Sequence, residues 1–177
     1  MIPYFRFAVI LVLVFIHIPG SAQKSYILIP KKTGRVDIKM AAALPPHLKA
    51  IAAFYSAMGG TSCTEGECAL TTALGLGKQG SDAQKKIIQK YFPGDKAAAL
   101  VVGQDCYLPP GSSSSFSNFQ SLSLSVEGEI VRVNYILAVY DHGNAKMIQG
   151  PDIYQFRNQV FQIKKRVLYA WTNKPNQ

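Results

Sequence analysis

The sequence predicts an α+β protein in which helices pack on one face of a twisted antiparallel β-meander. Three observations lead to this fold class. Between residues 44 and 94, apolar residues recur with the period of α-helices. From residue 119 onward, apolar and polar residues alternate with the two-residue period of strands. Helical and strand segments are therefore segregated along the chain, as in α+β folds.

The chain begins with an expected secretory signal peptide, which we place at residues 1–22. Arg6 is its only charge, the apolar run covers residues 7–18, and small residues follow up to Ala22. The run is shorter than the roughly 20 residues that a membrane-spanning helix needs. We expect cleavage after Ala22, a periplasmic or extracellular location, and one domain over residues 23–177. We expect no transmembrane segment after the signal peptide.

Residues 24–40 predict two short strands around a turn at Lys32-Thr33-Gly34. In the second strand, Val36, Ile38 and Met40 alternate with charged residues. This alternation predicts that the three apolar side chains share one half-buried face.

Two helices are predicted at residues 44–60 and 81–94. Two prolines suit the first turn of the first helix, and two glycines end it. Ser81 and Gln84 at the start of the second helix predict a capping box, in which each side chain binds the backbone of the other.

After the second helix the pattern changes to strands. Residues 97–108 predict a buried strand, and the Ser-rich residues 109–118 predict a flexible loop. The meander that follows is expected at residues 119–126, 129–140, 145–157 and 160–171, with turns at 127–128, 141–144 and 157–159 and an interruption at Gly150-Pro151. This order of elements resembles the architecture of cystatin-like and NTF2-like cones.

The charge balance indicates what the protein contacts. The chain has 19 Lys and Arg residues against 10 Asp and Glu residues, and its formal charge is +9. Basic residues cluster at 30–35, 85–86 and 164–166. After export, nucleic acid is not an expected partner, so we expect a protein or an anionic envelope component. A basic surface that only keeps the protein soluble is the alternative.

Thr64 and Glu67 predict a capping box at the start of a further helix. Cys63 and Cys68 then occupy the two positions that touch in a hydrophobic staple. In an exported protein this proximity favours a Cys63–Cys68 disulfide. Pairing of Cys106 with either of the two remains an alternative.

A second interpretation of this helix is catalytic. The stretch "GECALTTAL", residues 66–74, resembles the nucleophile helix of papain-like amidases and peptidases. The resemblance implies Cys68 as nucleophile and a histidine as general base, for which His142 is the candidate. Two nearby glutamates disfavour the thiolate. His47 is interpreted as a surface residue at a helix start.

Other chemistries lack their residues in this sequence. There is no zinc-ligand spacing and no phosphate-binding loop, so we expect neither a metal nor a cofactor. Asp105 and Asp152 are the acids beside predicted core strands and form a candidate buried acid pair. Aromatic residues of the predicted sheet are expected in the core, with a pocket at the open end of a curved sheet as the alternative; they are Tyr135, Tyr154, Phe156, Tyr169 and Trp171.

The sequence therefore predicts a small exported basic protein that binds its partner without catalysis. The alternatives are a thiol amidase or peptidase that uses Cys68 and His142, and a small-molecule pocket protein with a cone-shaped fold.

Overall fold

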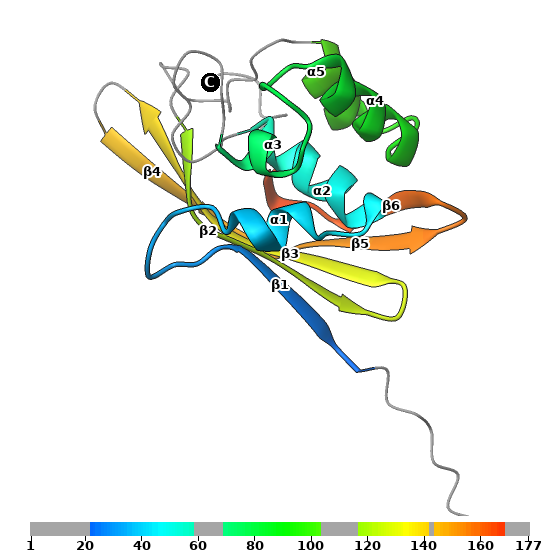
Figure 1. Ribbon diagram of the computed structural model, residues 1–177, viewed down its shortest axis with the longest axis horizontal. Coiled ribbons are helices and arrows are strands. Elements are labelled where there is room, and N and C mark those ends of the chain that lie inside the picture. The colour runs from blue at the N-terminus through cyan, green and yellow to red at the C-terminus, as the bar shows by residue number, and fades with distance from the viewer. Residues whose placement is uncertain (1–21, 59–68, 104–116, 142–143, 169–177) are drawn as a thin grey trace, which may run out of the picture.

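A computed structural model describes residues 22–58, 69–103, 117–141 and 144–168. They form the predicted α+β fold, with helices on one face of a six-stranded antiparallel sheet (Figure 1). The strands are β1 (Lys24–Ile29), β2 (Ser117–Glu127), β3 (Ile130–Asp141), β4 (Asn144–Gln149), β5 (Asp152–Arg157) and β6 (Val160–Lys165). The helices are α1 (Ile38–Ala42), α2 (Pro46–Ser56), α3 (Ala69–Ala73), α4 (Asp82–Tyr91) and α5 (Lys96–Gly103).

The sheet follows the predicted meander from β2 onward. Its order is β1-β2-β3-β5-β6, and β4 also pairs with β3. One half of β3 pairs with β4, with Ile136 opposite Gln149, and the other half pairs with β5, with Val133 opposite Asp152. The predicted interruption at Gly150-Pro151 is confirmed, because it separates two strands that share one edge of β3.

Helices α2 and α4 lie within the predicted ranges. At the start of α4, the Ser81 hydroxyl accepts a hydrogen bond from the Gln84 N–H at 3.2 Å. The Gln84 side chain does not return to Ser81. It accepts from the Gly80 N–H at 2.8 Å and donates to the carbonyl of Ala53 in α2 at 3.0 Å. Only half of the capping box forms, because Gln84 is buried between the two helices.

The strand predicted over Val36, Ile38 and Met40 is wrong, since this segment forms helix α1. The Asp37 carboxylate accepts a hydrogen bond from the Met40 N–H at 3.0 Å and caps the helix. Val36 and Met40 still pack against the core. Ile38, the first helical residue, is turned outward and is 67% exposed. The segment therefore forms a helix, because the N-cap hydrogen bond of Asp37 stabilises the helix start although the alternation of apolar residues indicated a strand.

The buried strand predicted at 97–108 is also wrong where the structure describes it. Its described part belongs to helix α5. The Asp95 carboxylate starts this helix by accepting hydrogen bonds from the N–H groups of Ala97 and Ala98, at 2.9 and 3.2 Å. The signal in the sequence was Asp95 followed by Lys96 and three consecutive alanines, which combine a favoured N-cap with high helix propensity.

The last predicted strand, 160–171, is too long. Strand β6 ends at Lys165, and residues 169 and beyond lie outside the described residues. Phe161 is buried as expected, whereas Ile163 is 43% exposed. Arg166, directly after the strand, is buried. The apolar pattern misled here because the chain leaves the sheet after Lys165 and the Arg166 guanidinium binds the carboxylate of Asp95.

The core lies between the helices and the sheet. Tyr135 and Tyr154 are buried in it and Phe156 packs against it, which confirms the core interpretation for the described sheet aromatics. Phe92, at the end of α4, stacks on Phe161 at 5.0 Å and meets the edge of Tyr154 at 5.9 Å. Aromatic contacts of this kind hold the helical layer on the sheet.

Gly150 sits where β4 and β5 separate, and its substitution by alanine is expected to destabilise the protein. An added Cβ would lie 2.7 Å from Cε1 of Tyr135 and 2.8 Å from the carbonyl oxygen of Val133. We expect Gly150→Ala to lower the free energy of unfolding by about 1–3 kcal/mol, measured by urea denaturation. The control is Gly103→Ala, where a Cβ meets no atom within 4 Å. Equal effects at the two positions would contradict the steric explanation.

Candidate functional site

A cluster of polar side chains crosses the core from the sheet to the helices. We call it the buried polar cluster; it consists of Tyr55, Asp95, Tyr135, Asp152, Tyr154 and Arg166. The members come from α2, the start of α5, strands β3 and β5, and the segment after β6. The cluster therefore joins parts of the chain that are distant in sequence.

Asp152 is the acceptor at the centre of one half of the cluster. It is the first residue of β5, and its residue exposure is 0%. One carboxylate oxygen accepts from the Tyr55 hydroxyl at 2.5 Å. The other accepts from the Tyr135 hydroxyl at 3.2 Å and from the Val167 N–H at 2.6 Å. Three donors thus satisfy a carboxyl group that burial would otherwise make costly.

Arg166 is the donor at the centre of the other half. Its guanidinium binds both oxygens of Asp95, at 2.9 and 2.5 Å, in a bidentate pair. Its Nε donates to the Tyr154 hydroxyl at 3.0 Å, and Tyr154 shares a hydrogen bond of 2.9 Å with Tyr55. The guanidinium also lies over the Phe54 ring, 4.9 Å from its centroid. The two halves are joined through Tyr154 and Tyr55.

Burial and pairing shift the pKa values of this cluster in defined directions. Burial raises the pKa of Asp152 above 3.8, against the opposing effect of its hydrogen bonds. Burial also raises the pKa values of the three tyrosines, which therefore keep their protons. Burial works against the charge of Asp95 too, but the hydrogen bonds and charge of Arg166 outweigh it, and the pKa of Asp95 falls below 3.8.

The cluster has the composition of a reactive site but not its accessibility. The side chains of Tyr55, Tyr135, Asp152, Tyr154 and Arg166 belong to buried residues, and each has a hydrogen-bond partner within the protein. What the cluster does is fix β5, α2 and α5 relative to one another.

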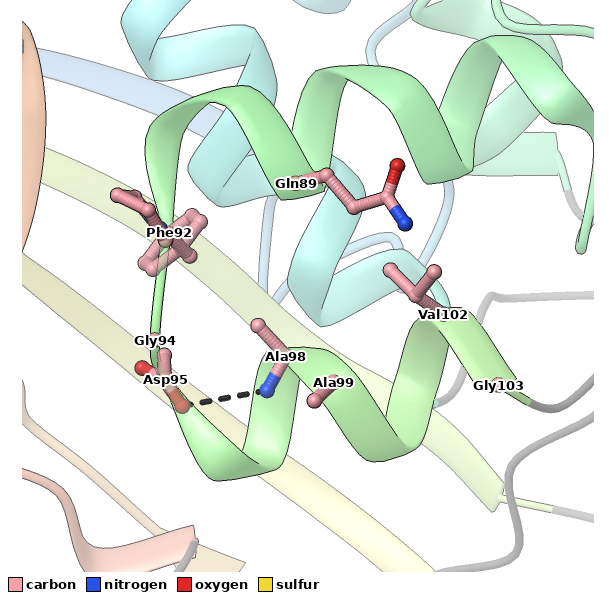
Figure 2. A pocket seen from close by; sticks show the side chains of 9 residues that line it. Gln89, Phe92, Gly94, Asp95, Ala98, Ala99, Val102 and Gly103 are labelled. Atoms are coloured by element: carbon pink, nitrogen blue, oxygen red, sulfur yellow. Dashed lines mark hydrogen bonds between the residues drawn. The ribbon is translucent and has the colours of Figure 1, made fainter.

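A surface hollow lies between α4 and α5 (Figure 2). It measures about 270 Å³ and is lined mainly by small and apolar residues, among them Ala98, Ala99 and Val102. Its acid, Asp95, is already engaged by Arg166 and by the N–H groups of α5. The hollow is therefore concave but has few polar groups that could orient a ligand.

All residues of the predicted thiol site, and all three cysteines, lie outside the described residues. They are Cys63, Cys68, Cys106 and His142, and the acid Asp105 lies outside as well. The disulfide, the thiol enzyme and the pairing of two acids remain predictions. Within the described ranges, no group of His, Cys, Asp and Glu side chains could hold a metal ion, and no helix is long and apolar enough to cross a membrane.

His47 departs from the surface role expected for it. Its ring stacks on Phe156 of β5, with centroids 4.5 Å apart. Partial burial lowers its pKa below 6.5. His47 thus contributes to the packing of α2 on the sheet.

A second feature is residues 31–39, most of which are exposed; we call it the basic segment. Lys31, Lys32, Arg35 and Lys39 are all exposed, and none of them forms an ion pair with a described residue. The backbone of the segment is ordered by hydrogen bonds, because the N–H groups of residues 33 and 34 donate to the Pro30 carbonyl at 3.1 and 2.9 Å. It presents positive charge from a fixed turn.

The basic segment is also attached to the sheet. The Asp37 N–H donates to the carbonyl of Leu28 in β1 at 2.8 Å. The carboxylate of Asp37 accepts from the Met40 N–H at the start of α1. Asp37, the one acid of the basic segment, therefore binds a backbone N–H group rather than one of the segment's cations. The sequence had indicated basic residues at 30–35, but not the continuation of the basic segment to Lys39, the second residue of α1.

No protein-family model matches this chain, and neither a curated protein nor a solved structure is detectably similar to it.

Proposed function

We propose that this protein is a small exported domain that binds an anionic partner without catalysis. The partner is an anionic component of the cell envelope or the acidic face of a protein. The observation that carries the proposal is the contrast between two sets of polar groups. The acids and tyrosines with reactive chemistry are enclosed and paired, whereas the cations of the basic segment are exposed.

The overall charge supports the same proposal. The chain carries a formal charge of +9. The ion pairs among the described residues engage Arg132 with Glu127 and Arg166 with Asp95, so the carboxylates of these pairs do not neutralise the basic segment. An uncompensated positive surface raises the local concentration of negatively charged partners and speeds their association. Export remains part of the proposal and rests on the composition of residues 1–22.

The proposal is tested by retention on a polyanion. We expect the exported protein to be retained on immobilised sulfated polysaccharide at low salt. Added salt screens its charges, so we expect release as the Debye length falls below about 8 Å. The control is the same protein with its lysines acetylated, which removes their charge and should abolish retention. Passage of the unmodified protein without retention at low salt would contradict the proposal.

A further inference from the structure

We propose that the basic segment docks this protein on the anionic headgroups of a phospholipid bilayer, with Ile38 entering the headgroup region. The inference rests on the proposed function and names its site and partner. The first observation is the position of Ile38. It is 67% exposed, more than any other large apolar side chain among the described residues, the next being Met147 at 56%.

The local structure explains why Ile38 is exposed. As a strand, the segment would have placed Ile38 on the same side as Val36 and Met40. The Asp37 cap starts a helix instead, and Val36 and Met40 pack on the core while Ile38 points away from it. Two anchors fix the orientation of the side chain between them. Ile38 is therefore presented outward by an ordered backbone.

The surroundings of Ile38 identify the chemistry of the partner. Lys31, Lys32, Arg35 and Lys39 share its segment and are exposed. An apolar side chain among cations is the composition with which proteins enter the interface of an anionic bilayer. Each cation close to such a leaflet strengthens binding by about fivefold. The four cations and Ile38 provide the two kinds of attraction that a bilayer surface requires.

The shape of the segment favours a bilayer over a peptide. The connection between β1 and α1 protrudes from the body of the protein (Figure 1). Its turn is closed by the hydrogen bonds to Pro30, so little entropy is lost when it binds. A protruding turn fits a flat, deformable surface, whereas an extended or helical peptide needs a sheet edge or a groove.

The site is tested by sedimentation with lipid vesicles. We compare vesicles of phosphatidylcholine with vesicles that contain about one third phosphatidylglycerol, an anionic lipid. The exported protein is expected to bind the anionic vesicles and not the neutral ones. The variant Lys31→Gln, Lys32→Gln, Arg35→Gln, Lys39→Gln is expected to lose about 600-fold in partitioning, which is about fivefold for each of the four charges.

A matched variant separates this site from net charge. Lys78, Lys86, Lys96 and Lys164 are also exposed, and their replacement by glutamine removes the same charge from other elements. We expect this variant to lose at most about fivefold. Equal losses in the two variants would overturn the proposed site. Circular dichroism and thermal unfolding of both variants are used to check that each keeps the fold of the natural protein.

The role of Ile38 is tested by fluorescence. The background variant Trp171→Phe removes the chain's single tryptophan. Ile38→Trp in this background is expected to shift its emission to shorter wavelength with anionic vesicles and to be quenched by brominated lipid. Met147→Trp, at the next most exposed apolar position, serves as the control and is expected to show neither change. An unchanged spectrum at position 38 would overturn insertion.

The outcomes distinguish this inference from the proposed function. Retention on the polyanion without binding to anionic vesicles would overturn the bilayer as partner and leave the proposed function in place. If the variant that lacks the four cations still binds anionic vesicles, the basic segment is not the docking site, whereas the bilayer as partner and the proposed function remain in place. Failure on both surfaces would overturn the inference and the proposed function together.

Discussion

Replacement of Arg166 with methionine is expected to lower the free energy of unfolding by about 3–5 kcal/mol. Methionine fills much of the same space but supplies no charge and no donors. Asp95 would keep its hydrogen bonds to the N–H groups of α5, yet its buried carboxylate would lose the bidentate partner at 2.9 and 2.5 Å. Urea denaturation followed by circular dichroism measures the loss.

Two controls identify the uncompensated charge as the cause. Asp95→Asn removes the charge and keeps an oxygen that can cap α5. The double variant Asp95→Asn, Arg166→Met is therefore expected to be at least about 1 kcal/mol more stable than Arg166→Met alone. Arg132→Met breaks the exposed pair with Glu127 at 3.4 Å and is expected to cost less than about 1 kcal/mol. A double variant as unstable as the sum of its parts would contradict this explanation.

Replacement of Asp152 with alanine is expected to lower the free energy of unfolding by about 3 kcal/mol or more. The change leaves the hydroxyls of Tyr55 and Tyr135 and the Val167 N–H without their acceptor in the core. Each buried donor that loses its partner costs about 1–3 kcal/mol. Asp152→Asn, which keeps one oxygen and the same shape, is expected to cost less than alanine.

The asparagine variant also tests the charge state of Asp152. Burial raises the pKa of Asp152 above 3.8, so the folded state holds this proton to higher pH than the unfolded state. The stability that the carboxyl group contributes is therefore complete below pH 3.8 and is lost as the pH rises through the folded-state pKa.

Asparagine does not titrate, so the stability advantage of the natural protein over Asp152→Asn is expected to shrink as the pH rises. Asp95, whose pKa is lowered, has the opposite trend, but it is present in both proteins and cancels in the comparison. Urea denaturation from about pH 3 to about pH 8 measures the difference. An advantage that grows with pH would show that Asp152 is more acidic in the folded state.

Where sequence prediction of the fold succeeded, the period of the pattern and the ends of the element agreed. Helix α4 has its apolar face and the Ser81 cap, and on either side of the β2–β3 turn the buried side chains fall at alternate positions, Leu122 and Leu124 in β2 and Val131 and Val133 in β3. It failed where the two signals disagreed. Asp37 and Asp95 each begin a helix that the apolar pattern alone presents as a strand. A capping side chain supplies a hydrogen bond that periodicity does not reveal.

The candidate sites were only partly predictable. Asp152 was recognised as an acid beside a core strand, but its partner Tyr55 lies 97 residues earlier in the chain. Arg166 was grouped with Lys164 and Lys165 as a basic cluster because the three are adjacent in sequence. In the structure Lys164 and Lys165 are exposed, whereas Arg166 is buried. Its burial depends on Asp95, 71 residues away. No local pattern encodes pairs at such separations, since only the finished packing brings them together.

The pairing of β1 with β2 has a consequence for the order in which the protein folds. Lys24 lies opposite Val126, so the first strand to be synthesised pairs with one made much later. At ordinary rates of synthesis, β2 is completed about 5–20 s after β1. Strands β2 and β3 are joined by a tight turn and can form a hairpin at once. The oldest strand of the sheet therefore joins an edge that younger strands have already built.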